Sequence, residues 1–295
     1  MNTNETHRSD QLFDGAVNLI HTTTDFGVVH PKEPHFAERF GKILELTGQD
    51  RILAQKLETK VRTIPNTVVT PIGNVDELEP QEVAAGFLRT PEASDGVVVS
   101  ITGETLLKIG VMIMTADCGV IKILAPNGEL AVLHGGLNNV DNEVDGSSIV
   151  ENAIAHFRRQ GFHPGELRFQ IGQAASGTAY GFDATHPKWM GINERRARSL
   201  SERYGNDVIQ TIDPRLIRGG GIGFDVALIA ARQAEQARIR DIEIDDLCVS
   251  THGLAEAVMG EFDTYGDFYS NVRENPATLA ANKYGSRSAA VICGA

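Results

Sequence analysis

The sequence is poor in cysteine: it has only Cys118, Cys248 and Cys293, and no two of them form a C-x-x-C pair. This scarcity argues against a disulfide framework and against a structural zinc ribbon. It is typical of a reducing compartment, so we expect a cytoplasmic location. The N-terminus is polar and shows no targeting segment, and no apolar run reaches the roughly 18 residues that a membrane span requires.

Positive charge is also scarce. There are 27 Lys and Arg residues against 39 Asp and Glu residues, which gives a formal net charge of −12 at pH 7. Proteins that bind nucleic acid usually present a basic surface, and this composition does not favour one. We therefore expect a small-molecule substrate, with no nucleic acid and no membrane as partner. The oligomeric state is left open.

No repeat, low-complexity segment or long linker divides the chain. We expect a disordered tail over residues 1–11 and a single mixed α/β domain over residues 12–295. Apolar residues at helical spacing predict helices over 36–48, 147–162 and 224–239. Short β-branched runs bounded by turn residues predict strands over 67–73, 96–101, 108–116, 119–125, 130–135, 166–172, 207–212 and 288–295.

Residues 114–136, MTADCGVIKILAPNGELAVLHGG, have the pattern of a β-hairpin with a cysteine and a histidine near its ends. The Pro-Asn-Gly sequence at 126–128 is typical of a three-residue hairpin loop. In that register His134 lies opposite Val120, and Cys118 lies two residues further along the same face. The two side chains are then diagonal neighbours, whereas a two-residue loop would turn them to opposite faces.

Two kinds of chemistry are open to such a pair. His134 can take the thiol proton of Cys118 to make a thiolate nucleophile for acyl transfer, helped by a backbone N–H near Gly135 and Gly136. Alternatively, thiolate and imidazole are two of the three protein ligands of a catalytic zinc. Because cysteine is often buried and histidine is often part of a core, the residue pattern alone favours two core side chains.

A set of motifs in a fixed order resembles the laccase-domain family (YfiH-like, also labelled multicopper polyphenol oxidase). The matching segments are SDGVVV at 94–99, TADC at 115–118, HGGLNN at 134–139, FQIGQAASGTAYGFD at 169–183, CVSTHG at 248–253, FYSNVRE at 268–274 and GSRSAAVI at 285–292. The resemblance implies a mixed-sheet α/β/β/α sandwich of the type shared with cysteine hydrolases. It also implies a cytoplasmic enzyme with a zinc held by two histidines and the cysteine.

The family resemblance further implies activity on purine nucleosides, either phosphorolysis with phosphate or adenosine deamination. Some bacterial members are tied to the editing of peptidoglycan precursors. On this basis Cys118 and His134 are the expected catalytic and metal-binding residues. The expected substrate-binding residues are Arg62, Asp95, Asn138, Tyr180, Ser270, Arg273 and Arg287.

The chain departs from the family pattern in ways that bear on the metal. Arg62 stands where the family has its first zinc-binding histidine, and arginine cannot bind a metal. Arg62 could instead bind an anionic substrate group. His21, His30 and His252 are candidate third ligands without motif support. No copper is expected, because the chain has no H-x-H pattern.

Three hypotheses therefore stand side by side. The first is a zinc enzyme acting on purine nucleosides or a related small substrate. The second is a metal-free cysteine hydrolase or amidase with Cys118 as nucleophile and His134 as base. The third is a non-catalytic member of the family that binds a ligand after losing its metal.

Overall fold

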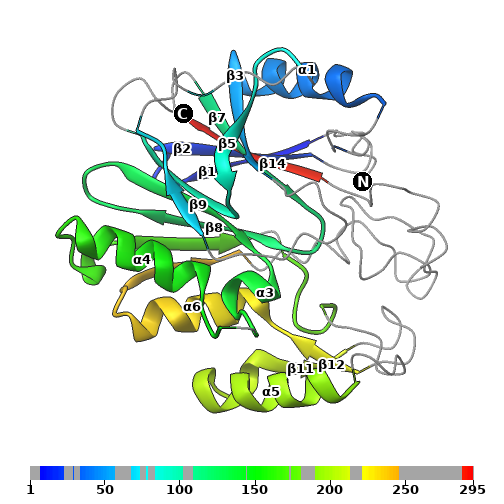
Figure 1. Ribbon diagram of the computed structural model, residues 1–295, viewed down its shortest axis with the longest axis vertical. Coiled ribbons are helices and arrows are strands. Elements are labelled where there is room, and N and C mark those ends of the chain that lie inside the picture. Colours follow the sequence, from blue (N-terminus) through cyan, green and yellow to red (C-terminus); the bar gives the residue numbers. More distant parts are fainter. Residues whose placement is uncertain are drawn as a thin grey trace.

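The computed structural model shows two six-stranded sheets stacked face to face, with helices on the outer side of each (Figure 1). It describes residues 7–22, 29, 34–56, 68–73, 78, 84–101, 109–143, 145–172, 174–180, 190–212, 221–245 and 288–294. Within these residues the layers run from helix to sheet to sheet to helix. The mixed α/β/β/α sandwich expected from the sequence is confirmed.

The first sheet has the strand order β1-β2-β14-β7-β3-β5. Its strands are β1 His7–Leu12, β2 Val17–Thr22, β3 Arg51–Lys56, β5 Phe87–Ala93, β7 Ile109–Thr115 and β14 Ser288–Gly294. β14 pairs antiparallel with both β2 and β7, while β3 runs parallel to β5 and β7. The sheet is therefore mixed, and residues from near the C-terminus form one of its inner strands.

The second sheet has the order β13-β10-β8-β9-β6-β4. Its strands are β4 Val69–Pro71, β6 Gly96–Ser100, β8 Gly119–Leu124, β9 Glu129–Gly135, β10 Arg168–Gly172 and β13 Asp241–Ile244. The β8–β9 hairpin supplies the two central strands. A small separate sheet pairs β11 Ile209–Thr211 with β12 Ile222–Phe224.

The helices begin and end at residues suited to those positions. They are α1 Phe36–Thr47, α3 Leu137–Val140, α4 Ile149–Arg159, α5 Met190–Tyr204 and α6 Val226–Gln236, with short 3-10 turns η3 Pro164–Glu166 and η4 Asn206–Val208. The side chains of Ser148 and Asp225 accept hydrogen bonds from the first turns of α4 and α6. Gly48 ends α1 in the left-handed conformation. None of the described helices is long and apolar enough to cross a membrane.

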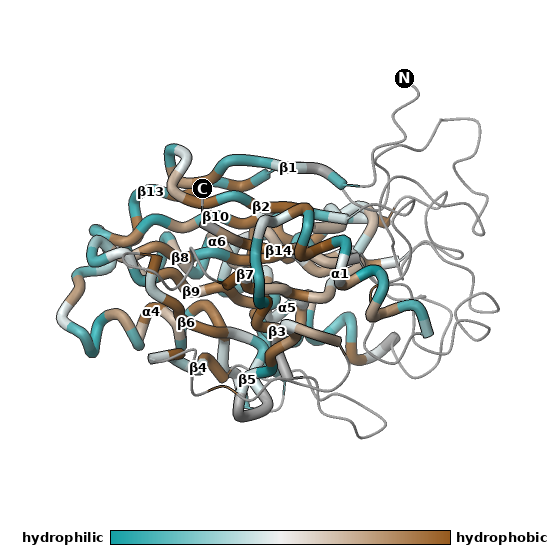
Figure 2. Tube along the Cα trace, turned by 90° about the horizontal axis from the view of Figure 1, so that it is seen from above, coloured by the Kyte–Doolittle hydropathy of each residue, from teal (hydrophilic) through white to brown (hydrophobic). Residues whose placement is uncertain are grey.

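Three apolar clusters hold the layers together. One lies between the two sheets, a second packs α4, α5 and α6 on the second sheet, and a third packs α1 on the first sheet. In β9, Leu130 and Val132 belong to the cluster between the sheets, whereas Ala131 and Leu133 face the helices. Both faces of this strand are thus buried. The strongly apolar stretches of β7, β8, β9 and β14 gather at the centre in Figure 2.

Several elements were not expected from the sequence. The helix over 190–204 was missed, because most of its residues are polar and its apolar side chains are few. Strands β1, β2, β3, β5, β12 and β13 and the short helix α3 were also missed. Residues 7–11, expected to belong to a tail, form most of β1 and pair with β2. β1 and β2 form a local hairpin, and β2 in turn pairs with β14, which is far away along the chain and which the local sequence does not show.

Candidate functional site

The β8–β9 hairpin positions Cys118 and His134. Its loop has the expected form: the Ala125 N–H donates to the Glu129 carbonyl at 2.8 Å, and Gly128 has a φ of 80°. Val120 lies opposite His134, so the register predicted from the Pro-Asn-Gly loop is confirmed. Gly128 is suited to this place because the left-handed conformation is costly for other residues.

The same register decides which way His134 faces. Val120 and Val132 both belong to the cluster between the two sheets. Side chains alternate along a strand, so His134 shares the face of Val132. Cys118 comes just before β8, and its Sγ atom would lie 3.1 Å from a Cβ placed on Gly136. Cys118 and His134 are both partly exposed, whereas the valines beside them are buried.

The backbone around Cys118 is held by local hydrogen bonds. The Thr115 hydroxyl donates to the carbonyl of Cys118. The carbonyl of the preceding residue, Asp117, accepts the Ala175 N–H at 2.8 Å. These contacts join the β7–β8 connection to the segment that carries Tyr180. The backbone that carries the Cys118 side chain is therefore held on two sides.

Tyr180 belongs to the same neighbourhood. Burial raises the pKa of its phenol well above the usual value, and negative charge on Cys118 and on Asp117 raises it further. A hydrogen bond with the Leu137 backbone acts in the opposite direction. The phenol therefore stays protonated at neutral pH and can donate a hydrogen bond at the site.

Asp95 fixes the backbone on the histidine side. Its carbonyl accepts the His134 N–H at 2.8 Å, and its Oδ2 atom accepts the Asn139 amide at 2.8 Å. The residue is buried and its carboxylate is turned toward α3. These contacts support the strand end that carries His134, and a role for Asp95 in substrate binding stays a prediction.

Asn138 is exposed on α3, and its Oδ1 atom accepts a hydrogen bond of 2.6 Å from Arg196. Arg196 belongs to α5, so it was missed together with that helix. Four further residues predicted to bind substrate, together with two histidines considered as metal ligands, lie outside the described residues: Arg62, Ser270, Arg273, Arg287, His30 and His252.

The fit of a zinc ion can be tested on the described residues. No three His, Cys, Asp or Glu side chains among them gather as a metal site. His21, the described third-ligand candidate, is buried in β2 and does not complete such a group. A catalytic zinc needs three protein ligands, and Cys118 with His134 supplies two. The described residues alone do not fit the metal, so no chemical step is assigned to it.

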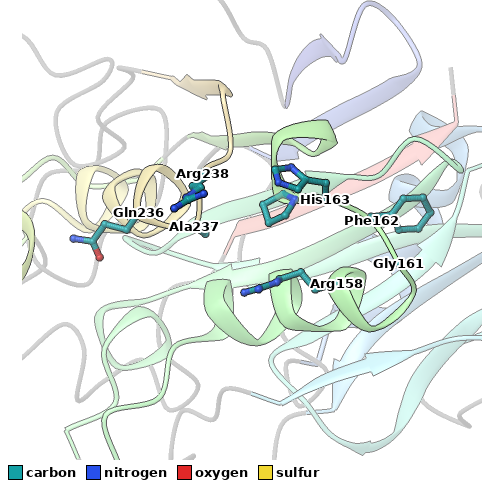
Figure 3. A pocket seen from close by; sticks show the side chains of 8 residues that line it. Arg158, Gly161, Phe162, His163, Gln236, Ala237 and Arg238 are labelled. Atoms are coloured by element: carbon teal, nitrogen blue, oxygen red, sulfur yellow. The ribbon is translucent and has the colours of Figure 1, made fainter.

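A cavity of about 560 Å³ lies apart from this pair, where α4 and α6 both end (Figure 3). Arg158, His163 and Arg238 are among its lining residues. The C-terminal end of a helix carries partial negative charge, which a nearby arginine offsets. His163 is exposed, and its Nδ1 atom accepts the Gly165 N–H at 3.0 Å. The favourable interaction of positive charge with helix C-terminal ends accounts for the arginines of this cavity.

Comparison with known proteins places these observations in context. A family model for "Multi-copper polyphenol oxidoreductase laccase" matches residues 50–278. A search of curated proteins finds no match. Three solved structures resemble the chain, and because they share at most 16% of its residues, the likeness concerns the fold.

The first of these structures is the hypothetical protein YfiH of Bacillus licheniformis, with a TM-score of 0.62, 16% identity and coverage of 95% of this chain and 93% of that one. The second is a Neisseria meningitidis protein of family DUF152, with a TM-score of 0.59, 16% identity and coverage of 98% and 99%. The third is YlmD of Geobacillus stearothermophilus, with a TM-score of 0.61, 15% identity and coverage of 95% and 92%.

Proposed function

Because the chain belongs to the multi-copper polyphenol oxidoreductase laccase family, we propose that it is an enzyme whose reaction takes place at Cys118 and His134. The observation that carries this proposal is the hairpin register. It places His134 on the face that borders the core between the sheets, and Cys118 directly precedes β8; both residues are partly exposed. We expect a small-molecule substrate and a cytoplasmic location.

The described residues best support nucleophilic catalysis by a cysteine–histidine pair. His134 takes the proton of the Cys118 thiol, and the thiolate sulfur attacks the carbonyl carbon of an acyl or amide substrate. The carbon–oxygen π electrons move to the carbonyl oxygen. When these electrons re-form the carbonyl double bond, the bond to the leaving group breaks and protonated His134 gives the leaving group a proton. Water then hydrolyses the thioester by the same route. Such a hydrolase or amidase, of the type that edits peptidoglycan precursors, is our first candidate.

Purine nucleoside chemistry is the second candidate. It is supported by the ordered motifs and by the ligand types of Cys118 and His134. In this candidate Cys118 and His134 would hold a zinc ion, which would supply Lewis-acid chemistry. A third ligand would then have to come from outside the described residues. We propose no copper, because the sequence has no H-x-H pattern.

One set of measurements tests both candidates. The purified protein and its Cys118→Ala, His134→Ala and Cys293→Ala variants are assayed for bound zinc, for alkylation by iodoacetamide and for turnover of nucleosides with phosphate and of amide substrates. Cys293 is a matched control because it is buried in β14, and burial raises the pKa of its thiol to about 11.

The outcomes separate the candidates. Metal-free protein with fast alkylation of Cys118 that is lost in His134→Ala supports the hydrolase. Stoichiometric zinc that is lost in Cys118→Ala, together with nucleoside turnover, supports the second candidate. The proposal is contradicted if the protein holds no zinc, Cys118 reacts like an ordinary thiol and no substrate is turned over. The third hypothesis, a non-catalytic binding protein, would then be the one that stands.

A further inference from the structure

The four-residue helix α3 follows Gly136 directly and connects the candidate site with the helical layer. A helix this short is not stable by itself. Two of its carbonyl groups are held from outside: Leu137 by Arg196 at 3.0 Å and Val140 by Gln233 at 2.7 Å. Its position therefore depends on side chains from α5 and α6.

Arg196 makes the largest number of these contacts. Besides Leu137, its guanidinium donates to the Asn138 Oδ1 atom at 2.6 Å, to the Asp141 Oδ2 atom at 3.0 Å and to the Asp141 carbonyl. The side chain of Arg196 is only 5% exposed and that of Asp141 only 7%. A buried arginine with four acceptors on one short segment fixes the orientation of that segment.

The opposite side of α3 meets the candidate site. The Leu137 backbone is hydrogen-bonded with Tyr180. The Asn139 amide donates to Asp95, whose own carbonyl holds the His134 N–H. Gly136, immediately before α3, lies against Cys118 Sγ. A displacement of α3 would therefore shift the surroundings of both Cys118 and His134.

Arg196 also acts on the candidate site through its positive charge. Arg203 also pairs with Asp141, so two guanidinium groups share one carboxylate and leave one positive charge uncompensated within this trio. Arg196 lowers the pKa of Tyr180, whereas burial and the negative charges of Cys118 and Asp117 raise that pKa by more. Arg196 therefore acts on Tyr180 through its charge as well as through α3.

We propose that Arg196 is a positioning residue of the Cys118–His134 site and acts through α3. This inference rests on the proposed function, because it takes the pair to be the reacting groups. Arg196 touches neither of them and is not a catalytic residue. Its contribution is to hold Gly136, Leu137 and Asn139 in register with the end of the β8–β9 hairpin.

The test compares Arg196→Met and Arg196→Lys with the wild type and with Arg232→Met. Arg232 is the matched control, because it forms ion pairs with Asp207 and Glu235 on the surface of the same helical layer and makes none with α3. Each protein is treated with iodoacetamide at one pH, well below its unfolding temperature. Mass spectrometry then follows the alkylation of Cys118 and of Cys293 separately.

Cys293 reports general loosening, because it is 2% exposed in the middle of the first sheet. We expect Cys118 alkylation to slow by about tenfold in Arg196→Met, as expected for a displaced reacting group, while Cys293 labelling stays unchanged. Arg196→Lys keeps the charge but loses the forked geometry, so its rate should be intermediate. Arg232→Met should match the wild type.

Cys118 rates within twofold of the wild type in both Arg196 variants would overturn the inference. A rise in Cys293 labelling with no change at Cys118 would overturn it as well, since that result describes a purely structural arginine. If Arg196→Met does not fold, the Arg196→Lys result decides alone. The His134→Ala measurement judges the proposed function separately, because it tests the pair itself and leaves the α3 contacts in place.

Discussion

The chemistry of single residues in this protein is set by their surroundings more than by their type. Cys118 and Cys293 illustrate this: one is partly exposed beside Gly136, and the other is buried in β14 with its thiol pKa raised to about 11. Lys122 is a further case, since β8 places it opposite Val132 and Gln170 in the space between the sheets. These surroundings lead to predictions for unfolding free energy and for the rate of thiol alkylation.

Replacing Lys122 with methionine should stabilise the protein at pH 7. Burial lowers the pKa of Lys122 to about 8, against the attraction of Asp245, Glu243 and Asp10. In the unfolded chain the lysine keeps its proton up to about pH 10.5. Folding must therefore remove this proton or bury the charge, and the resulting cost in unfolding free energy is fully present below pH 8. That cost disappears as the pH rises from 8 to 10.5. Lys122→Met should therefore gain up to about 3 kcal/mol at pH 7 and clearly less at pH 9.5.

Urea unfolding of the wild type and of Lys122→Met at the two pH values measures this effect. Lys42→Met is the control, because Lys42 is exposed on α1 and pairs with the exposed Glu38. The control should change little at either pH. An equal effect of Lys122→Met at pH 7 and pH 9.5 would show that the lysine charge is not responsible.

Gly136→Ala should disturb the candidate site directly. The new Cβ would lie 2.7 Å from Asn139 Oδ1 and 3.1 Å from Cys118 Sγ, and the Asn139 amide is held by Asp95. We expect a loss of about 1–2 kcal/mol in unfolding free energy and slower alkylation of Cys118. Gly41→Ala in α1 is the control, since no atom lies within 4 Å of its Cβ position and alanine favours helix. Alkylation at the wild-type rate in Gly136→Ala would contradict the described packing.

At the scale of elements, local chemistry predicted some features and long-range contacts decided others. The Pro-Asn-Gly loop determines the register of β8 and β9, so the position of His134 opposite Val120 could be derived from the sequence. The contacts of Arg196 with α3 could not be derived in this way, because Arg196 is far from α3 along the chain and its helix has a weak apolar pattern. The parts of the site that sequence reasoning missed are those held by distant side chains.

The start of α4 offers a test at this scale. The Ser148 hydroxyl caps the helix by accepting the Val150 N–H at 3.2 Å, and it donates to Gln233 Oε1 at 2.8 Å. Ser148→Ala should lower the unfolding free energy by about 1–2 kcal/mol, since a cap and a buried hydrogen bond are lost together. The hydroxyl of the neighbouring Ser147 donates to the exposed Asp145 carboxylate, so Ser147→Ala should cost less than about 0.5 kcal/mol. Equal losses in a urea titration would argue against the cap.

At the scale of the whole molecule, the cluster between the sheets makes the layers interdependent. Outside it, Phe36 and Phe40 of α1 pack against Phe87 of β5 with ring centroids 5.2 Å and 5.1 Å away. On the other side, α4 and α6 cover the second sheet. The shared middle layer implies that damage at the α1 face is transmitted to strands it does not touch.

Phe87→Ala should reveal this coupling. Phe87 is fully buried, and its truncation should cost about 3–5 kcal/mol. Hydrogen exchange should show the amides of β8 and β9 losing protection by the same free energy as those of β5. Val68→Ala, at a position 44% exposed, is the control and should have little effect. Loss of protection confined to α1 and the first sheet would show that the layers unfold independently.

The place of β14 also has a consequence for synthesis on the ribosome. β14 sits between β2 and β7, yet it is made of residues 288–294. Both neighbours leave the exit tunnel long before their partner exists, and each presents an open strand edge during that interval. The first sheet can close only after residues 288–294 have been synthesised, which slows its folding and leaves the nascent sheet in need of protection from aggregation.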